Sequence, residues 1–172
     1  MDTLIVDVAQ YAIFLVAIGA VAVWVAVGRS VKVRLAVEAV VTVAVVAILV
    51  KVTSGLHTDP RPFVADPSLR PMFPHPPDNG FPSDHTALAS GVAFLVTAYR
   101  RWIGAALLAI AVAIGLARVA AHVHHLQDIG AGLLIGLVAA AVALLVWRLA
   151  AACWVRVRSR PGGPTRLHEP SG

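Results

Sequence analysis

Three short polar clusters interrupt a largely apolar sequence, and each contains residue types that bind or attack phosphate. They are Asp59-Pro60-Arg61-Pro62, Phe81-Pro82-Ser83-Asp84-His85 and the segment from Arg118 to Asp128. Arginine makes bidentate contacts with phosphate oxygens, serine and a helix start supply neutral donors, and histidine transfers protons or attacks. The clusters together predict a site that binds an oxyanion and acts on it.

The third cluster has the spacing of a catalytic dyad. His124 and Asp128 are four residues apart, so their side chains face the same way on a helical turn. The carboxylate can then hold one ring nitrogen protonated while the other remains nucleophilic. His85 is the candidate for protonating a leaving oxygen, and Asp84 or Asp59 is the neighbouring acid that would help it to stay protonated.

These clusters resemble the three signature motifs of the type 2 phosphatidic acid phosphatase superfamily, K-x6-R-P, P-S-G-H and S-R-x5-H-x3-D. The third motif reads Arg118-x5-His124-x3-Asp128 with its spacing intact, and the second reads Pro82-Ser83-Asp84-His85. With an aspartate in place of the glycine, the second motif is similar to that of undecaprenyl-diphosphate phosphatases of the bacitracin-resistance type. The motifs span residues 51–128, so the resemblance covers most of the chain.

The resemblance implies a lipid phosphatase that needs neither a metal nor a cofactor. In such an enzyme His124 would attack phosphorus and form a phosphohistidine, Asp128 would orient it, and His85 would be the general acid. The substrate would be undecaprenyl diphosphate, a lipid carrier of cell-wall synthesis, cleaved to the monophosphate outside the membrane. The residues that would bind the phosphoryl oxygens are Arg61, Arg118, Ser83, Asp84 and Lys51.

The sequence departs from the family pattern at two positions. Ala117 stands where the third motif has its serine, which removes one hydroxyl donor. The lysine of the first motif is missing, because Ser54 stands seven positions before Arg61. Lys51, ten positions before Arg61, is the nearest replacement, and His57 is the other.

Other functions remain open from the residues alone. His122, His124, His125 and Asp128 could bind zinc or manganese, since imidazole and carboxylate suit both. The substrate could instead be phosphatidic acid, phosphatidylglycerol phosphate or another prenyl phosphate, because the motifs read the phosphoryl group and not the tail. Glu38, inside an apolar run, prompts a small transporter as a further alternative. A noncatalytic membrane subunit that keeps the family's helices is the last.

The composition predicts the elements that must carry these residues. Hydrophobic residues make up 59% of the chain and charged residues 13%, whereas soluble domains carry about 25% charged residues. Apolar runs near the roughly 20 residues that cross a bilayer predict an all-α, polytopic membrane bundle of five transmembrane helices. The third run is short, so its helix should continue from a buried loop. The runs are at about Val8–Val27, Leu35–Val50, Thr86–Tyr99, Ile103–Val119 and Ile129–Trp147.

The basic residues predict the orientation of this bundle. Ten of the 14 lysines and arginines lie in the connections after the first and third apolar runs and after Trp147. Under the positive-inside rule these regions are cytoplasmic. The amino terminus and all three polar clusters are then extracytoplasmic, and the carboxyl terminus is cytoplasmic. The net charge of +5 follows this topology and does not indicate nucleic acid as a partner.

The remaining segments complete the expected organisation. Residues 51–85 contain eight of the 11 prolines, which predicts an ordered irregular loop with a turn at Asn79-Gly80. Gly132 and Gly136 share a helix face and are expected to permit close packing. Residues 1–158 should form one membrane phosphatase domain, and residues 159–172 a disordered cytoplasmic tail. The expected partners are a lipid phosphate substrate and membrane lipids, and no pattern indicates the oligomeric state.

Overall fold

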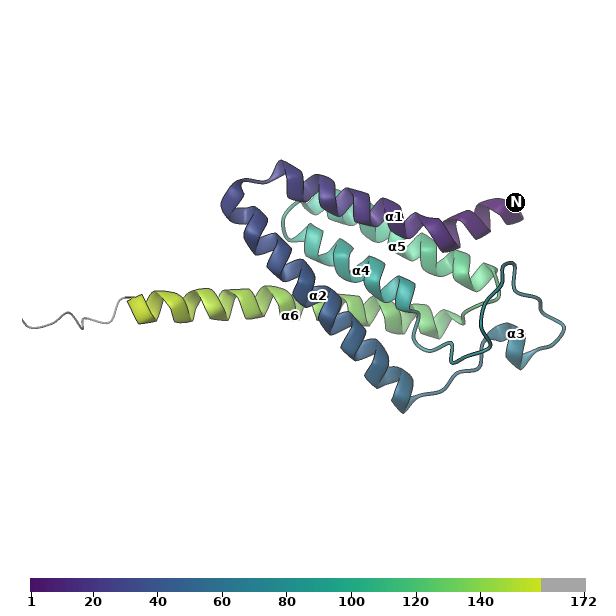
Figure 1. The fold of residues 1–172 in the computed structure, drawn as a ribbon. Coiled ribbons are helices and arrows are strands. Elements are labelled where there is room, and N and C mark those ends of the chain that lie inside the picture. The colour runs from purple at the N-terminus through teal and green to yellow at the C-terminus, as the bar shows by residue number, and fades with distance from the viewer. Residues whose placement is uncertain (159–172) are drawn as a thin grey trace, which may run out of the picture.

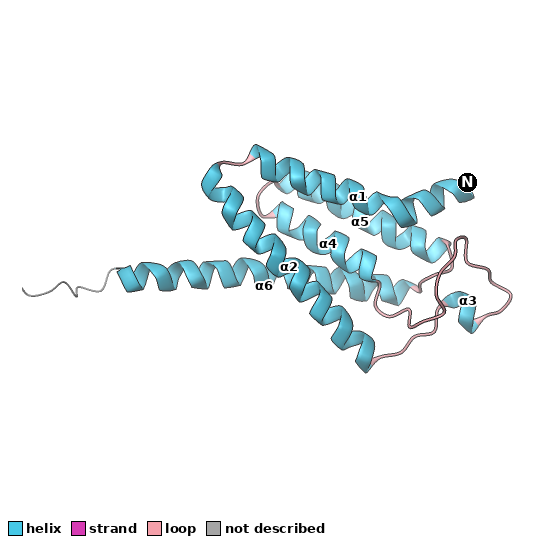
Figure 2. Ribbon diagram, viewed as in Figure 1, coloured by secondary structure: helices cyan, strands magenta, loops and turns pink. Residues whose placement is uncertain are grey.

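The computed structural model describes residues 1–158, and this part of the chain is all-helical apart from its connections (Figure 1; Figure 2). The all-α prediction is confirmed for these residues, and the predicted tail 159–172 lies outside them. The helices, in chain order, are α1 (Asp2–Ala26), α2 (Arg29–Leu56), α3 (Pro62–Ala65), α4 (Asp84–Thr97), α5 (Arg101–Ala120) and α6 (Leu126–Arg158).

Each predicted apolar run corresponds to a long helix, but most of these helices extend past the run. Helix α2 begins at Arg29, before Leu35, and α6 continues past Trp147 to Arg158. Arginine and lysine are good helix formers whose charged ends reach water from an apolar stem. The apolar run therefore marks the membrane-embedded part of a helix rather than its ends. The four-residue α3 has no counterpart among the predicted segments.

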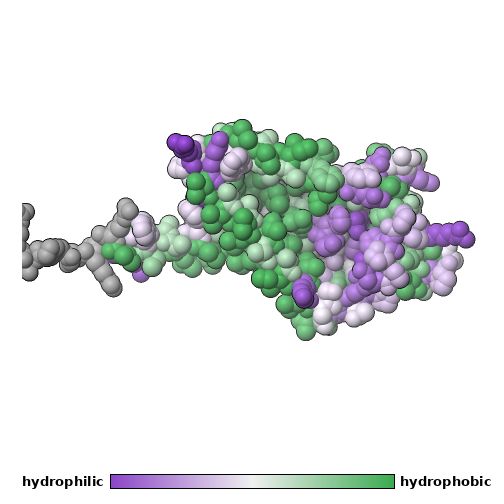
Figure 3. Space-filling view, viewed as in Figure 1, coloured by the Kyte–Doolittle hydropathy of each residue, from purple (hydrophilic) through white to green (hydrophobic). Residues whose placement is uncertain are grey.

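Within residues 1–158, four helices are long and apolar enough to cross a membrane, namely α1, α2, α5 and most of α6. Large apolar side chains on their surfaces are exposed, among them Phe14 at 61% and Leu134 at 61%. Figure 3 shows apolar residues over the helical part and a concentration of polar residues at the end where α3 lies. Because such an extensive apolar surface suits lipid rather than water, the chain is a multi-pass membrane protein.

Helix α4 lies at the centre of the bundle, in contact with α1, α2, α5 and α6. It has 14 residues, or about 21 Å of helix. Its contact with α6 is close because a methyl group added to Gly136 would lie 2.5 Å from the amide nitrogen of Gly91. One added to Gly132 would lie 2.7 Å from the carbonyl oxygen of Ser83. The predicted packing role of these two glycines is confirmed.

The connection between α2 and α4 and the turn between α5 and α6 lie at the same end of the bundle as the amino terminus (Figure 1). Asn79 attaches the first of these to α2, since its amide nitrogen donates to the carbonyl oxygen of His57 at 2.9 Å. Its amide oxygen accepts from the backbone nitrogens of Asp59 at 2.9 Å and Phe81 at 3.0 Å. All three polar clusters lie in these two connections or at the helix ends that adjoin them, so they share one end of the bundle.

Candidate active site

The way in which α5 ends determines where His124 lies. The backbone nitrogen of His122 donates to the carbonyl oxygen of Val119 at 3.0 Å, and that of Val123 donates to Arg118 at 3.1 Å. These two bonds form a Schellman motif, and His122 supplies its left-handed residue with φ of 61°. Glycine usually fills this position because a side chain adds strain. The turn stops the helix just past Arg118 and brings His124 into the interior, 1% exposed.

His124 and Asp128 make the contact that their spacing predicts. Nδ1 of His124 lies 3.2 Å from Oδ2 of Asp128, and both side chains are buried. The same carboxylate oxygen accepts a hydrogen bond from the backbone nitrogen of His125 at 2.8 Å. On the other side of the ring, Nε2 lies 3.3 Å from Nη1 of Arg61, which can only donate. The proton therefore sits on Nδ1, and Nε2 keeps its lone pair.

Arg61 reaches this ring from the connection after α2. Its Nη1 also donates to the carbonyl oxygen of Val123 at 2.8 Å, and its Nε donates to Oδ1 of Asp78 at 2.8 Å. The side chain of Asp78 is largely exposed, whereas that of Arg61 is buried. These contacts hold the guanidinium beside Nε2 of His124. A phosphoryl group attacked by that nitrogen would therefore meet the positive charge of Arg61 directly.

Arg118 contributes a second buried guanidinium. Its Nη1 donates to the carbonyl oxygen of Ala9 at 3.2 Å, and its Nη2 lies 3.1 Å from Nε2 of His75. The His75 ring in turn lies edge-on to that of His124, with centroids 6.3 Å apart. Nε of Arg118 is buried and has no hydrogen-bond partner within residues 1–158. A buried donor without a partner is costly, so this nitrogen is suited to an oxygen of a bound anion.

The second cluster meets the third through the backbone. The backbone nitrogen of Ser83 donates to the carbonyl oxygen of Asp128 at 3.1 Å. The Ser83 hydroxyl caps α4 by accepting from the backbone nitrogen of Thr86 at 3.4 Å, so its orientation is set by the helix start. Two residues along, Nδ1 of His85 lies 3.0 Å from Oδ1 of Asp84. The cluster thus presents a half-buried imidazole that is held by a carboxylate.

Burial and charge favour the neutral form of the buried His124 ring and of the half-buried His75 ring. Burial lowers the pKa of His124, the hydrogen bond with Asp128 opposes this, and the positive charges of Arg118 and Arg61 lower the pKa further. Burial is also the largest cause that lowers the pKa of His75, followed by the charge of Arg61. Both shifts favour the neutral imidazole, which is the form that can attack phosphorus.

The family model described as the PAP2 superfamily matches residues 33–152. The chain belongs to this superfamily, that of the type 2 phosphatidic acid phosphatases, and the resemblance of its motifs is confirmed. It is a membrane phosphatase. Over 81% of its length and 68% of the relative, it is 34% identical to the bacitracin transport permease protein BcrC of Bacillus licheniformis.

Two further similarities fall within the same superfamily. The undecaprenyl-diphosphatase BcrC of Bacillus subtilis is 26% identical over 80% of this chain and 70% of the relative. The crystal structure of LpxE from Aquifex aeolicus superposes with a TM-score of 0.66 at 26% identity, covering 83% of this chain and 84% of that one. The helical arrangement is therefore that of a solved PAP2 superfamily protein.

The first PAP2 motif is only partly present in the cluster. Lys51 is exposed, and no hydrogen bond or ion pair among the described residues connects it to Arg61. The ring of His57 instead packs edge-on against Phe81, with centroids 4.7 Å apart. Ala117 is buried and has no polar group to offer. Which residue replaces the motif's lysine stays a prediction.

One group of side chains beside the dyad has donor types that suit a metal. Nδ1 of His125 lies 3.0 Å from Oδ2 of Asp59, and Asp59, His125 and Asp128 offer ligand atoms within 4.8 Å of one another. Of the four residues considered from the sequence, His122 bonds a loop carbonyl instead, and His124 is engaged by the dyad. Metal independence of the reaction stays a prediction.

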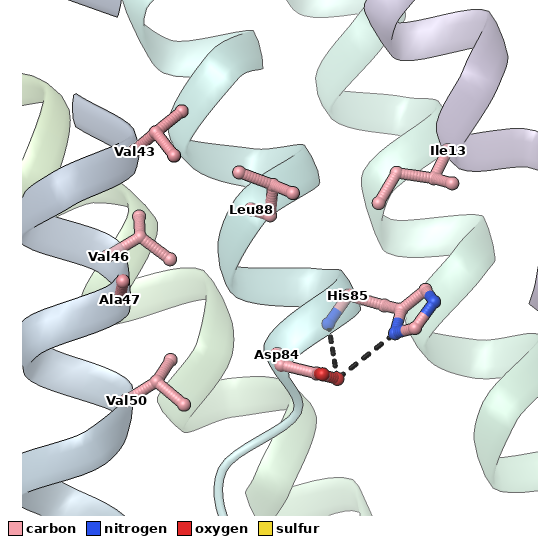
Figure 4. A pocket seen from close by; sticks show the side chains of 8 residues that line it. All are labelled: Ile13, Val43, Val46, Ala47, Val50, Asp84, His85 and Leu88. Atoms are coloured by element: carbon pink, nitrogen blue, oxygen red, sulfur yellow. Dashed lines mark hydrogen bonds and ion pairs between the residues drawn. The ribbon is translucent and has the colours of Figure 1, made fainter. Parts of the chain in front are cut away.

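An apolar pocket of about 280 Å³ lies beside the second motif (Figure 4). His85 and Asp84 form its polar end. Its other walls come from membrane helices α1 and α2 and from α4, so it is continuous with the lipid-facing part of the bundle. The apolar residues that line it are Ile13, Val43, Val46, Ala47, Val50 and Leu88.

Several residues of the connection between α2 and α4 contact the arginines of the candidate site, although no residue spacing in the sequence predicted that they would. His75 contacts Arg118, and Asp78 pairs with Arg61. Gly80 had a partial signal, because it follows Asn79 in a predicted turn. A methyl group added to it would lie 3.1 Å from the carbonyl oxygen of Asp59. The loop therefore passes too close to itself there for a larger residue to fit without a shift.

Proposed function

We propose that the chain hydrolyses undecaprenyl diphosphate to the monophosphate and inorganic phosphate through a phosphohistidine. The observation that carries this proposal is the buried His124, whose Nδ1 is held by Asp128 while Nε2 faces Arg61. The PAP2 family supports phosphate-ester chemistry, and a relative named an undecaprenyl-diphosphatase supports this substrate.

In the first step, Nε2 of His124 attacks the terminal phosphorus, and the bond from phosphorus to the bridging oxygen breaks as the nitrogen–phosphorus bond forms. Arg61 and Arg118 bind the nonbridging oxygens, because positioned positive charge supplies most of the catalysis in phosphoryl transfer. His85 donates a proton to the bridging oxygen, and the lipid monophosphate leaves. Asp84, which contacts Nδ1 of His85, aims the other ring nitrogen at that oxygen.

In the second step, water attacks the phosphorus of the phosphohistidine. His85 lost its proton in the first step, so it accepts one from the water as the new oxygen–phosphorus bond forms. The nitrogen–phosphorus bond breaks, and inorganic phosphate leaves with its charge held by Arg61 and Arg118. His124 returns to its neutral form. Water is the only co-reactant that this sequence of steps requires.

The pocket beside His85 supports a lipid rather than a soluble phosphate as substrate. It is lined by aliphatic side chains from α1, α2 and α4, with Asp84 and His85 at one end. A prenyl chain that enters from the bilayer could bury its first units there while its diphosphate reaches the histidines. Apolar contact of this kind contributes roughly 25 cal/mol per Å² of buried surface.

We propose that α4 is a fifth crossing, which begins below the surface because the residues just before it, Gly80, Pro82 and Ser83, are buried in protein. The site would then be extracytoplasmic, with the amino terminus outside and the carboxyl terminus in the cytoplasm. The support is the charge distribution, since eight of the 12 lysines and arginines in residues 1–158 lie toward the opposite end of the helices. Residues 1–158 would constitute the phosphatase domain.

The proposal is tested with purified chain and undecaprenyl diphosphate labelled at the terminal phosphate. The wild type should release labelled phosphate in the presence of EDTA, and rapid quenching should trap label on histidine. His124→Ala should show neither, whereas His122→Ala, which removes a neighbouring imidazole that is not engaged by Asp128, should show both. Release by His124→Ala would refute the assigned nucleophile. If EDTA abolished phosphate release and added zinc or manganese restored it, metal independence would be refuted.

The identity of the lipid substrate is determined by comparing kcat/KM for undecaprenyl diphosphate, phosphatidic acid, phosphatidylglycerol phosphate and a prenyl monophosphate. Undecaprenyl diphosphate should give the highest value. A higher value for one of the others would replace the substrate and leave the chemistry intact.

Transport is a second candidate, because a 34% identical relative is named a bacitracin transport permease protein. A carrier would move its cargo across proteoliposomes without releasing phosphate. Uptake of labelled bacitracin by vesicles that contain His124→Ala would favour transport. Phosphate release that depends on His124, with no uptake, would favour the phosphatase.

A further inference from the structure

A second pocket, with a polar lining, lies at the other end of the bundle, far along the helices from His124. Its volume is about 400 Å³. It is formed where α1 and α4 end, where α2 begins and where α6 passes, whereas the PAP2 site is formed by the starts of α4 and α6 and the end of α5. The residues that line it are Ala26, Val27, Gly28, Val31, Arg34, Ala98, Tyr99, Arg100, Leu144 and Arg148.

Three of these lining residues are arginines, and none is acidic. Arg34 is paired with the buried Glu38, at 2.8 Å from Nε to Oε1. Tyr99 donates its hydroxyl to the same glutamate, so the glutamate is satisfied within the protein and is not exposed in the pocket. Arg100 and Arg148 carry charges that no carboxylate neutralises within residues 1–158. The pocket therefore has an excess of positive charge.

The start of α2 adds to the positive electrostatic potential of the pocket. Gly28 and Val31 line the pocket, and Gly28 is the residue before the helix. The helix start has no side-chain cap and no acidic residue in its first turn. The first intrahelical bond runs from the nitrogen of Lys32 to Gly28, so the preceding amides have no helical partner. Free amides at a helix start attract anions, and here they stand beside the arginines.

The composition of the pocket matches a phospholipid headgroup. Its arginines and the amides at the start of α2 would bind a phosphate. Its apolar residues Ala26, Val27 and Leu144, at the end of α1 and along α6, lie next to the lipid-facing surface. Basic pockets between helices at the cytoplasmic side of a bilayer bind anionic headgroups. We infer that this pocket binds the phosphate of an anionic phospholipid, at a site separate from the one that would hold the substrate.

The test measures thermal stability of the full chain in a neutral detergent, with phosphatidylglycerol, phosphatidylcholine of the same acyl chains, or sodium phosphate added. Phosphatidylglycerol should raise the melting temperature by about 5 °C, and native mass spectrometry should detect one retained molecule. Phosphatidylcholine, with no net charge, should give a much smaller shift. A shift with sodium phosphate that is lost in Arg100→Gln/Arg148→Gln would assign the pocket to soluble phosphate and overturn the lipid assignment.

The matched variants are Arg100→Gln/Arg148→Gln and the control Arg29→Gln/Arg101→Gln. Both remove two positive charges at the same end of the bundle, but neither control residue lines the pocket. The first variant should lose at least half of the shift caused by phosphatidylglycerol, and the control should keep it. Equal shifts in the two variants would overturn the proposal.

Phosphate release by both variants shows that they are folded, because the PAP2 site lies at the opposite end. If the double variant does not fold, Arg148→Gln replaces it, since Arg148 is exposed and has no partner in the described part of the chain. That single change should also reduce the shift, and an unchanged shift would count against the pocket.

Discussion

The backbone nitrogen of Ser83 donates a hydrogen bond to the carbonyl oxygen of Asp128, 3.1 Å away. This bond joins the start of α4 to the start of α6. The proposed general acid, His85, lies two residues after Ser83 in the first turn of α4, and the proposed nucleophile, His124, is held by the side chain of Asp128. Two motifs that are far apart in the sequence are thus brought together by the main chain, before any contact with a substrate.

Asp128→Asn tests the negative charge of the dyad. In the proposed mechanism, positive charge develops on the ring of His124 when its Nε2 bonds to phosphorus, and the carboxylate of Asp128 offsets that charge. The His125 backbone nitrogen, 2.8 Å from Oδ2, should keep an oxygen of the new amide facing Nδ1. The tautomer is then retained while the charge is lost. We expect kcat to fall by about 10²–10⁴-fold.

The control for this change is Asp66→Asn, in which an exposed loop aspartate bonded to the Ser68 amide is altered in the same way. Its kcat should match the wild type. A wild-type kcat in Asp128→Asn would show that the carboxylate only packs against His124. The measurement is phosphate release under single-turnover conditions, so that product release does not mask the chemical step.

The pH dependence of kcat/KM should report the lowered pKa of His124. Burial and the charges of Arg118 and Arg61 lower this pKa against the opposing hydrogen bond from Asp128. An ordinary histidine has a pKa of about 6.5, so His124 remains neutral at pH values where such a histidine is half protonated. Activity should therefore persist as the pH falls through 6.5 and decline only below it.

The pH profile of the activity that remains in Arg61→Gln is a second test of this prediction. Removing one of the charges that lower the pKa of His124 should move the acidic limb of the profile to higher pH, in addition to the loss of rate. An acidic limb above pH 6.5 in the wild type, or one that moves to lower pH in the variant, would contradict the assignment of His124 as the group that must be neutral.

The sequence predicted those parts of the fold and the site that follow from helical periodicity or from the residue spacing of the family motifs. The contact between His124 and Asp128 follows from four-residue spacing, and the apolar runs located the long helices. The contacts of His75 and Asp78 with the two arginines were beyond reach. They depend on how a proline-rich loop folds over the bundle, and an irregular loop has no repeat from which side-chain directions can be read.

Helix ends were also poorly predicted, for a related reason. Hydrophobicity locates the part of α2 and α6 that lies in lipid, whereas the helix continues through basic residues that favour it. At the end of α5, a histidine occupies the left-handed position where glycine is usual. No glycine signal marked that turn, although the placement of His124 depends on it.

His122→Gly should stabilise the protein relative to His122→Ala. Both changes lose the hydrogen bond between Nδ1 and the carbonyl oxygen of Arg70. Only glycine relieves the left-handed strain at φ of 61°, which costs roughly 1–2 kcal/mol for a residue with a side chain. The glycine variant should melt several degrees above the alanine variant, with phosphate release retained in both. Equal melting temperatures would show that the turn carries little strain.

Gly136→Ala should destabilise the contact between α4 and α6. The added methyl would lie 2.5 Å from the Gly91 nitrogen, a backbone atom that cannot rotate away. Overpacking of this kind costs about 1–3 kcal/mol. The matched control is Gly130→Ala on the same helix, where an added methyl meets nothing within 4 Å and helix propensity improves. A melting temperature lowered only by the first change would support the packing role, and equal effects would refute it.

Asp84→Asn distinguishes a role in aiming His85 from the predicted role in binding phosphate. The carboxylate oxygen of Asp84 lies 3.0 Å from Nδ1 of His85, and a carboxylate can only accept hydrogen bonds. We therefore expect kcat to fall roughly tenfold or more with little change in KM. Because Asp84 would act through His85, adding Asp84→Asn to His85→Ala should cause no further loss, in the manner of coupled residues. Additive losses, or a raised KM at constant kcat, would instead place Asp84 against the substrate.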